Sequence, residues 1–565
     1  MTEVSGASAF SYPETLPGVI LPPESRLKKY IELGALPLKC LASELRVSFE
    51  THASNIAIWT TELTYTYREL DELSDRIGAA LLDLGLNSGD RAIFQMRSTP
   101  DFYIAFIACL KAGIVPVCSL STHRKLEIDY LATEAQAKAH FIDGDDAKFD
   151  MAEFACETRD RLGTIKHIIS TDGVESRNVQ SLHALGKRFD WASARARISD
   201  VQFRPFDPVV FQLSGGTTGV PKIIPRLQCE YLENWRLTIE RLGYVSQDRM
   251  FMAYPPIHNA AMGCCWGPML LSGGTVVVPT ELSGPHFAEV LNSARPTWIG
   301  QLISGLTPYF KEAEKLGGQF SSVRALFQAG SVEMADQARD WLGVETWQMF
   351  GMTEGLYLYP RAGDPDEVWS KTLGRPLSDH DEVIILEPGT ERELPAGEIG
   401  EMACRGPFIL SGYYNSPERN AEAFTSDGFY RSGDLMARLR IGARDYFRFE
   451  GRIKDVINRG GEKINATEVE NVILRHPLVS QVAVVGYPCE RLGERGCAIV
   501  VLENSSQPLS LKDLKDFLEE IGLAKFKWPE RIEIVNSLAL TKAGKPDKAE
   551  MRRIVLETLA ADRVA

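Results

Sequence analysis

The sequence predicts an α/β protein with a large, multi-subdomain N-terminal domain and a small, mobile α+β C-terminal domain. Three observations support this: a chain of 565 residues that is 44% hydrophobic, helical and extended segments that alternate for several hundred residues, and a change of pattern near Arg452. One hydrophobic core seldom serves so long a chain, so at least two domains are expected. We place them at residues 1–453 and 454–565.

The first clear element is a helix in the segment TYRELDELSDRIGAALLDLGL. Thr66 and Glu69 have the spacing of a capping box, apolar residues recur at helical intervals, and Gly85 ends the helix. The next expected elements are a strand, a helix and a second strand, at residues 92–94, 102–110 and 114–117. A strand–helix–strand order of this kind indicates a mostly parallel sheet.

The alternation continues along the chain. WGPMLLSGGTVVVP predicts a helix and then a strand, VRALFQAG predicts a strand before the helical EMADQARDWLG, and MAYPPI is strand-like. After Arg452, the segments ATEVENVILRHPLVSQVAVVGYP, LSLKDLKDFLEEIGL and RIEIVNSL predict a helix, a strand, a helix and a strand within about a hundred residues. These short elements define the smaller domain.

Composition excludes several classes of function. The net charge of −14 and pI of about 5.3 argue against a nucleic-acid partner. The N-terminus has neither a basic nor an apolar leader, and the longest apolar run, residues 102–110, is about half a membrane span. We therefore expect a soluble, cytoplasmic protein with no membrane partner. Ten cysteines without a CxxC pair are expected to be reduced thiols in the core.

The segment LSGGTTGVPKIIPR, residues 213–226, has the composition of a phosphate-binding loop. Its glycines let the backbone wrap closely around a ligand, while two threonine hydroxyls and Lys222 supply donors. It is not a P-loop of the GxxxxGK[ST] type, because Lys222 follows Gly219 by three residues and precedes Ile223. A Gly/Thr-rich turn alone is usually only a turn, so further motifs are needed.

Four further stretches supply them: MFGMTEG, YRSGDL, GRIKDVINRGGEKI and TKAGKPDK. In this order and spacing the five motifs resemble the adenylate-forming superfamily of acyl- and aryl-CoA synthetases, peptide-synthetase adenylation domains and luciferases, and the resemblance covers essentially the whole chain. LSGGTTGVPKIIPR and HNAAMGC are most similar to the stand-alone aryl-acid adenylating enzymes of siderophore and aryl-capped natural product pathways, such as 2,3-dihydroxybenzoate- and salicylate-AMP ligases.

This resemblance implies an ATP- and Mg²⁺-dependent ligase. A carboxylate is a poor electrophile, so it is first activated: the aryl carboxylate attacks the α-phosphorus of ATP, pyrophosphate leaves, and the resulting acyl adenylate is easily attacked by a thiol. The acyl group then passes to the phosphopantetheine thiol of an aryl carrier protein, or alternatively to free coenzyme A. A non-catalytic nucleotide-binding scaffold is a remote alternative, and the presence of Thr218, Glu354, Asp434 and Lys545 weighs against it.

The resemblance also implies the ATP site. Glu354 would bind Mg²⁺, Thr353 would contact the α-phosphate, and Asp434 would accept hydrogen bonds from the ribose hydroxyls, although an Asp after Ser-Gly is on its own more often a turn residue. The complete implied set is Ser214, Gly215, Gly216, Thr217, Thr218, Gly219, Lys222, Gly330, Ser331, Val332, Met349, Phe350, Gly351, Thr353, Asp434, Phe449, Arg452 and Lys545.

Catalysis is assigned by the same resemblance. The implied catalytic residues are Lys545, Thr218, Glu354 and His258. A lysine near a C-terminus is ordinarily a solvated surface charge, but the matching lysine of the family reaches from the small domain and neutralises charge between the carboxylate and the α-phosphate. It does so in one domain orientation, and Lys454 matches the hinge about which the small domain turns.

The implied substrate residues are His258, Asn259, Ala260, Cys264, Gly330 and Tyr357. Asn259 matches the asparagine that bonds the group ortho to the carboxylate, although an Asn after His in a loop can equally form a turn. Ala260 stands where a bulky aromatic is usual and Tyr357 where a small aliphatic is usual, so the other ring substituents stay open. A further departure is MARLRIGARDYFRFE, slightly longer than the family's usual hairpin.

Overall fold

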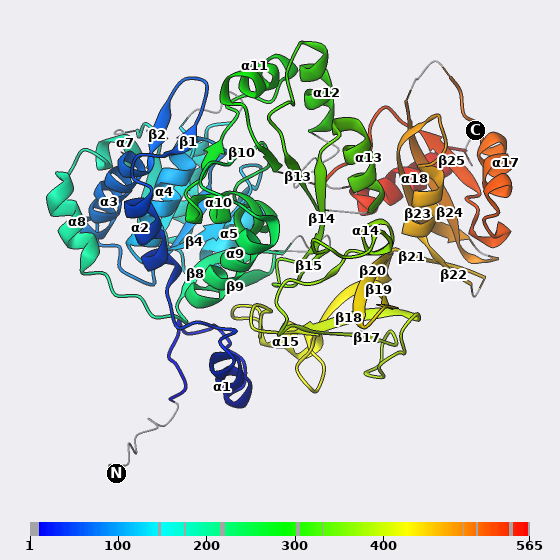
Figure 1. Ribbon diagram of the computed structural model, residues 1–565, viewed down its shortest axis with the longest axis horizontal. Coiled ribbons are helices and arrows are strands. Elements are labelled where there is room, and N and C mark those ends of the chain that lie inside the picture. The colour runs from blue at the N-terminus through cyan, green and yellow to red at the C-terminus, as the bar shows by residue number, and fades with distance from the viewer. Residues whose placement is uncertain are drawn as a thin grey trace.

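The computed structural model describes residues 11–144, 149–174, 177–214, 221–300, 306–329, 332–460, 462–489, 491–503, 507–541 and 546–562. They form four β-sheets surrounded by helices, with the last sheet and its helices set apart at the C-terminal end (Figure 1). The predicted α/β fold with a large N-terminal and a small C-terminal part is confirmed. Among the described residues, no helix has the length and apolar character needed to cross a membrane.

A seven-stranded sheet forms the first layer, in the order β7-β6-β5-β3-β4-β8-β9, and all its pairs are parallel except β8 with β9. Its strands are β3 (Arg91–Gln95), β4 (Val115–Cys118), β5 (Ala139–Ile142), β6 (His167–Ser170), β7 (Val179–Ser181), β8 (Pro208–Leu213) and β9 (Ile223–Leu227). The helices of this region are α1 (Glu24–Glu32), α2 (Leu41–Thr51), α3 (Tyr67–Asp83), α4 (Pro100–Lys111), α5 (Lys125–Glu134), α6 (Met151–Leu162), α7 (Leu182–Leu185) and α8 (Trp191–Ser199).

Helix α3 begins as its sequence predicts. The Thr66 side chain accepts the Glu69 backbone N–H, and the Glu69 carboxylate accepts the Thr66 backbone N–H at 2.8 Å, so both halves of the capping box form. Gly85, with φ +92°, follows the last turn of the helix. The predicted strand, helix and strand that follow are β3, α4 and β4, and β3 pairs with β4 in parallel.

A nine-stranded sheet forms the second layer, in the order β16-β15-β14-β13-β12-β10-β11-β1-β2. Its strands are β1 (Ile56–Trp59), β2 (Thr64–Thr66), β10 (Arg249–Phe251), β11 (Thr275–Val277), β12 (Trp298–Gly300), β13 (Ala325–Ala329), β14 (Glu345–Gly351), β15 (Tyr357–Tyr359) and β16 (Arg375–Pro376). The helices that accompany it are α9 (Gln228–Leu242), α10 (Gly267–Leu271), α11 (Gly284–Ala294), α12 (Thr307–Lys315), α13 (Val332–Leu342) and α14 (Asp366–Lys371).

The region after β10 differs from the prediction. The strand ends at Phe251, so MAYPPI is not a strand, and the two prolines in it lack the N–H groups that a sheet ladder needs. Asn259 and Ala260 are not in a loop but begin a helical turn that continues as a π-helix, Ala261–Trp266. Such turns are rare and are frequent at functional sites.

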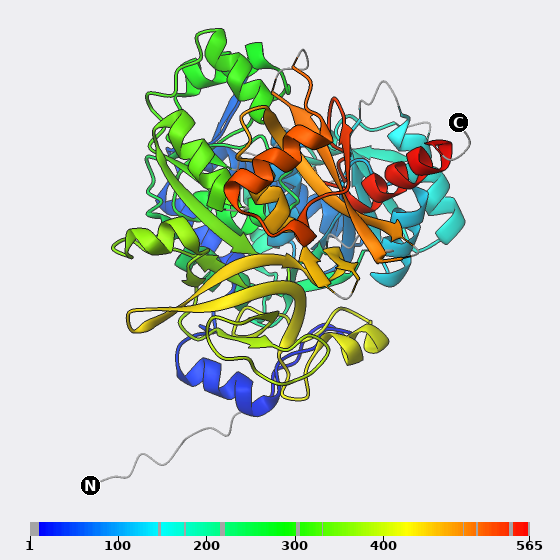
Figure 2. The ribbon, with the colours of Figure 1, turned by 90° about the vertical axis from the view of Figure 1, so that its right-hand side faces the viewer.

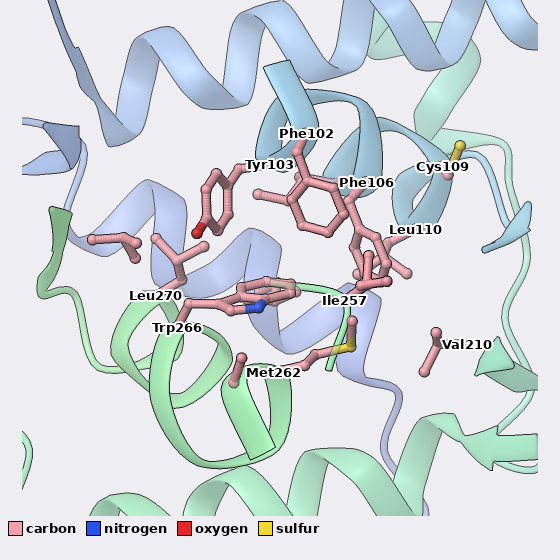
Figure 3. Packing of buried hydrophobic residues seen from close by; sticks show 14 of the residues in the cluster. Phe102, Tyr103, Phe106, Cys109, Leu110, Val210, Ile257, Met262, Trp266 and Leu270 are labelled. Atoms are coloured by element: carbon pink, nitrogen blue, oxygen red, sulfur yellow. The ribbon is translucent and has the colours of Figure 1, made fainter. Parts of the chain in front are cut away.

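The π-helix is anchored in the apolar core between the two large sheets. The Trp266 ring meets Phe102, Tyr103 and Phe106 of α4 edge to face, with ring centroids 6.3, 5.5 and 5.5 Å apart (Figure 3). The Trp266 indole N–H donates to the Pro256 carbonyl oxygen at 2.8 Å. This packing fixes the backbone that carries the predicted substrate residues.

A four-stranded antiparallel sheet, β17-β18-β19-β20, follows. Its strands are β17 (Glu382–Leu386), β18 (Ile399–Arg405), β19 (Tyr430–Ile441) and β20 (Arg444–Arg452), and α15 (Pro417–Ala423) lies beside it. Strands β19 and β20 form one long hairpin that reaches out as an arm, drawn in yellow in Figure 2. Asp434 pairs with Arg452 at its open end, and Ile441 pairs with Arg444 at its tip.

The C-terminal part has the predicted order of helix, strand, helix and strand, which are α16, β23, α17 and β25. Its elements are β21 (Val456–Arg459), β22 (Glu462–Asn465), α16 (Ala466–Ile473), β23 (Val479–Cys489), β24 (Gly493–Leu502), α17 (Leu511–Ile521), β25 (Arg531–Ile534) and α18 (Lys548–Asp562). A short 3₁₀ turn, Ile453–Asp455, joins β20 to this part. All ten cysteines are free and eight are buried, in agreement with their predicted role as core thiols.

Candidate active site

Part of the predicted site lies outside the described residues: Gly215, Gly216, Thr217, Thr218, Gly219, Gly330, Ser331 and Lys545. Val332 is the first residue of α13, and only its backbone is described. The roles assigned to these residues therefore stay predictions.

The two ends of the predicted phosphate loop are described. Strand β8 ends at Leu213 and β9 begins at Ile223, and the Ser214 N–H donates to the Lys222 carbonyl oxygen at 3.1 Å. The described ends of the loop therefore belong to two adjacent antiparallel strands and lie close together. The Lys222 ammonium lies 4.6 Å from the centroid of the Tyr413 ring, which orients it by a cation–π contact.

The Glu354 carboxylate is the centre of a buried polar cluster. Its Oε1 accepts hydrogen bonds from the Tyr413 and Tyr430 hydroxyls at 2.9 and 3.1 Å, and the two hydroxyls are 2.9 Å apart. Burial, followed by the Glu354 charge, raises the pKa of both tyrosines, so their hydroxyls stay protonated donors. With Lys222 beside Tyr413, a cation, an anion and two hydroxyls meet next to the phosphate loop.

The backbone that carries Glu354 is held from three sides. The Arg226 guanidinium donates to the Thr353 carbonyl oxygen at 3.0 Å, and the Leu410 N–H donates to the Glu354 carbonyl oxygen at 2.8 Å. Gly355 has φ +120°, and a Cβ there would lie 1.8 Å from the Phe408 carbonyl oxygen. Only glycine fits this turn, so the direction of the Glu354 side chain is set by the fold.

The predicted nucleoside residues converge from three strands. The buried Asp434 carboxylate lies 2.9 Å from the Arg452 Nε, across the open end of the β19–β20 hairpin. The rings of Phe350 on β14 and Phe449 on β20 are 6.0 Å apart at an interplanar angle of 32°. Gly351 follows Phe350 at the exposed end of β14, and a Cβ there would lie 2.7 Å from both the Met349 sulfur and the Tyr357 ring, so only glycine fits beside them.

Asn259 is the hub of the predicted aryl pocket. Its Oδ1 accepts a hydrogen bond from the Tyr231 hydroxyl at 2.9 Å, and its Nδ2 donates to the Tyr357 hydroxyl at 2.7 Å. All three side chains are buried. The asparagine is therefore held in one orientation before any substrate arrives, which fixes the direction of its remaining donor and acceptor capacity.

Further polar groups surround Gly263 in the π-helix. A Cβ there would lie 2.6 Å from the Tyr357 hydroxyl and 3.5 Å from both the Tyr231 hydroxyl and the Asn234 Oδ1. Asn234 is fully buried, and neither end of its side-chain amide has a hydrogen-bond partner among the described residues. Burial raises the pKa of the Cys264 thiol to about 12, so this wall of the pocket is uncharged.

The other two predicted substrate residues lie at the start of the same helix. The His258 Nδ1 accepts the Ala260 backbone N–H at 3.2 Å, and its ring meets Tyr254 edge to face at 4.8 Å. Ala260 is buried. His258 therefore borders the pocket with its ring position fixed.

The structure brings the predicted hinge directly after the nucleoside site. Lys454 lies in the 3₁₀ turn Ile453–Asp455, two residues beyond Arg452. At the start of α18 the Lys548 ammonium lies 2.8 Å from the Glu470 carboxylate of α16, which fixes the segment that follows the TKAGK stretch.

Sequence reasoning missed several residues of the site: Arg226, Tyr231, Asn234, Tyr413 and Tyr430. The signal for Tyr231 and Asn234 is their spacing of three on α9, since such a pair shares one helix face. No local pattern marks Tyr413 and Tyr430, which come from segments far from Glu354 in sequence.

Comparisons with known proteins agree with this geometry. Residues 45–414 match the family model of the AMP-binding enzymes, and residues 468–545 match the model of the AMP-binding enzyme C-terminal domain. The chain belongs to the AMP-binding enzyme family. The prediction of an adenylate-forming ligase is thereby confirmed.

Individual relatives are similar over nearly their whole length. A salicylyl-CoA synthase / salicylate adenylyltransferase of a Streptomyces species is 35% identical, covering 96% of this chain and 98% of the relative. The 2,3-dihydroxybenzoate-AMP ligase of Bacillus subtilis is 34% identical, and the match covers 95% of this chain and 98% of the relative. Among solved structures, apo MbtA of Mycobacterium smegmatis has a TM-score of 0.71 and 33% identity, covering 95% of this chain and 98% of its own.

Proposed function

We propose that this protein activates an ortho-substituted aryl carboxylic acid with ATP and transfers the acyl group to a phosphopantetheine thiol of a carrier protein. The proposal rests on the buried hydrogen bonds of Asn259 beside the Glu354 and Asp434 clusters. They place side chains suited to an aryl acid next to side chains suited to a nucleotide. The names of the relatives support the same reaction. Free coenzyme A is the second candidate acceptor, because the name of one relative includes a CoA synthase activity.

In the first half-reaction a carboxylate oxygen forms a bond to the α-phosphorus, and the bond from that phosphorus to the pyrophosphate oxygen breaks. Two anions must approach each other, so preorganised donors are needed. Thr217, Thr218, Gly219 and Lys222 are the proposed donors to the β- and γ-phosphates, and Thr353 is the donor to the α-phosphate.

Mg²⁺ is a proposed cofactor, and Glu354 fits it. Carboxylate oxygens are its preferred ligands, and in nucleotide sites it takes one or two carboxylates while phosphates and waters complete the shell. Among the described residues there is no group of three or more side chains able to hold a metal by themselves, so the single carboxylate of Glu354 is the protein ligand that we propose. The ion supplies charge neutralisation on the phosphates.

The proposed nucleoside contacts follow from the three strands. The buried Asp434 accepts hydrogen bonds from the two ribose hydroxyls, Arg452 lies over the same sugar, and Phe350 and Phe449 flank the adenine. Carboxylate oxygens are strong hydrogen-bond acceptors, and the Arg452 guanidinium at 2.9 Å fixes the position of this one.

The aryl pocket is proposed to recognise two polar groups on the ring. Asn259 bonds the ortho substituent, and the unpartnered amide of Asn234 bonds a second substituent beyond it. A buried amide without a partner costs free energy, so a ligand that supplies the bond gains affinity. This favours a doubly substituted acid, such as 2,3-dihydroxybenzoate or 3-hydroxyanthranilate, over a singly substituted one.

ATP–pyrophosphate exchange with a panel of acids tests this pocket. Losing the bond to Asn259 leaves a buried polar group unsatisfied, at a cost of about 1–3 kcal/mol, so benzoate should be activated about ten- to a hundred-fold less well than salicylate or anthranilate. Asn259→Ala should shrink this difference. Asn234→Leu, which keeps the volume, should narrow the gap between doubly and singly substituted acids.

The panel includes 3-hydroxypicolinate and a fatty acid. Tyr357→Phe is the control for Asn259→Ala, since it removes only the hydroxyl that accepts a hydrogen bond from Asn259 and keeps the asparagine itself. A fatty acid or an aliphatic amino acid as the best substrate would show that the aryl assignment is wrong, while leaving the adenylation chemistry intact.

We also propose that the domain boundary lies at residues 453 and 454, with Lys454 as the hinge. Lys454→Pro fixes φ at that position, so it should spare adenylation and depress thioester formation. The two half-reactions are measured separately, by exchange and by single-turnover discharge of the adenylate to a thiol. Lys454→Ala is the control, because it removes the ammonium and keeps the backbone freedom. Equal losses in both half-reactions for Lys454→Pro would contradict the hinge.

The acceptor is tested by isolating the aryl adenylate on the enzyme and adding either coenzyme A or a phosphopantetheinylated aryl carrier protein. Faster discharge by the carrier supports the proposal, and faster discharge by coenzyme A supports the second candidate.

A further inference from the structure

A polar recess of about 450 Å³ lies between the end of α9, the loop before α14, strand β16 and the tip of the β19–β20 hairpin. It is lined by Arg241, Arg361, Arg375 and Arg444. Arg444 and Arg452 are the first and last residues of β20, which places them roughly 26 Å apart at about 3.3 Å per residue. The recess is therefore separate from the ATP site at the open end of the hairpin.

The lining carries an excess of positive charge. Its only carboxylate among the described residues is that of Asp364, whose oxygens accept the Tyr446 hydroxyl at 2.9 Å and the Arg361 backbone N–H at 2.8 Å. Those donors are neutral, and Asp364 makes no ion pair with any of the four guanidinium groups, although its charge acts on Arg375. The chain as a whole has a net charge of −14, so four arginines around one recess make a region of positive charge on a negatively charged protein.

Two of the arginines share one outside partner. Asp379, which is 71% exposed, lies 2.9 Å from Arg361 and 3.2 Å from Arg375. Arg241 and Arg444 make no ion pair or side-chain hydrogen bond with any of the described residues, although Glu240 lies close enough to act on Arg241. The exposed Asp379 thus pairs with two of the four guanidinium groups, and the other two have no ion-pair partner among the described residues.

Burial makes this arrangement costly without a ligand. The Nε atoms of Arg241, Arg361 and Arg375 are buried and have no hydrogen-bond partner among the described residues. Partial burial, followed by repulsion from Arg361 and Arg375, lowers the pKa of Arg241. Groups that repel one another and lack acceptors at their buried nitrogens are stabilised by an anion that bonds several of them at once.

We propose that this recess binds a phosphate group. Each guanidinium group can donate two parallel hydrogen bonds to two oxygens of one phosphate. Four guanidinium groups around one cavity therefore offer more N–H donors than one carboxylate can accept. The phosphate is either free inorganic phosphate or the phosphate of a larger metabolite, since the recess is open at its mouth and far larger than one phosphate. The β19–β20 hairpin, which the sequence predicts to be longer than is usual in the family, supplies Arg444 and Tyr446 to the lining.

Calorimetric titration of the full-length protein tests the proposal. The titrants are inorganic phosphate, glucose 6-phosphate and malonate, each at constant ionic strength in chloride and with AMP saturating the nucleotide site. The double variant Arg241→Gln/Arg444→Gln removes the two arginines that lack a partner. Arg440→Gln is the matched control, because Arg440 lies on the same hairpin, pairs with Asp445 at 2.8 Å and does not line the recess.

The double variant should bind inorganic phosphate at least tenfold more weakly than the wild type. The phosphate affinity of Arg440→Gln should equal that of the wild type, and both variants should keep the wild-type rate of ATP–pyrophosphate exchange. Without phosphate, the double variant should melt at the same or a higher temperature, since neither arginine makes an ion pair and Arg241 is repelled by Arg361 and Arg375; a purely structural role would lower the melting temperature. Tighter binding of glucose 6-phosphate than of phosphate identifies a phosphorylated metabolite, and equal binding identifies free phosphate.

Two results would overturn the proposal. One is equal phosphate affinity in the wild type and the double variant, or in the wild type and Arg444→Gln alone, an exposed position where substitution leaves folding intact. The other is malonate binding as tightly as phosphate, which would mean that the recess selects charge and not the phosphate group.

Discussion

Lys545→Ala should slow formation of the aryl adenylate by about 10²–10³-fold while the protein still folds and binds ATP. The ammonium is proposed to act where charge develops between the carboxylate and the α-phosphate, and removing one such stabilising group costs this much in other enzymes. The loss should fall mainly on kcat, because the contact is made in the transition state and not in the ground state. The measurement is ATP–pyrophosphate exchange at saturating acid, together with calorimetric titration of ATP.

Lys542→Ala is the matched control, since it removes a lysine from the same TKAGK stretch without touching the proposed catalytic position. It should exchange pyrophosphate at close to the wild-type rate. Exchange by Lys545→Ala at the wild-type rate would remove the catalytic role. A proportional loss in both variants would point instead to the fold of the segment.

Glu354→Gln should lower adenylation by about a hundredfold and weaken the binding of a divalent cation in the presence of ATP. The substitution keeps the size of the side chain and removes the charge that we assign to Mg²⁺, so the affected quantity is metal affinity. Binding of Mn²⁺ to the enzyme–ATP complex, followed by electron paramagnetic resonance, gives a readout that does not depend on turnover.

Tyr413→Phe distinguishes the effect of the Glu354 charge from the effect of the hydrogen bonds that orient its carboxylate. This variant keeps the carboxylate and removes one of the two hydroxyls that donate to Oε1. Mn²⁺ affinity should change much less than in Glu354→Gln. Unaltered Mn²⁺ affinity in Glu354→Gln would show that the carboxylate does not hold the cation.

Sequence patterns predicted the elements whose signals are local. The capping box at Thr66 and Glu69 and the helical spacing after it set α3 without help from the rest of the chain. The C-terminal elements were equally predictable, because each is short and bounded by turn residues. MAYPPI was misread as a strand because its apolar residues suit one, whereas its two prolines remove ladder donors.

The site was predictable only where its residues lie in motifs. Glu354, Asp434 and Asn259 each belong to a recognisable stretch, but their partners come from elsewhere in the chain. Tyr413 and Tyr430 reach Glu354, and Tyr231 reaches Asn259, only after the sheets have packed. The recess is the extreme case, since its arginines come from α9, the loop before α14, β16 and β20, and no motif joins them in the sequence.

The end of β20 has a consequence for how such proteins diversify. The last residue of this strand, Arg452, still belongs to the hydrogen-bonded ladder with Asp434, and the connection to the next sheet is a single 3₁₀ turn. Every described residue of the proposed nucleoside site is therefore encoded before the junction, and β21 begins only at Val456. Recombination within these few codons would exchange the C-terminal sheet and helices of two relatives as one piece and leave each nucleotide pocket with its original parent. The junction is thus a position at which recombination can exchange the C-terminal part without dividing the proposed nucleotide site.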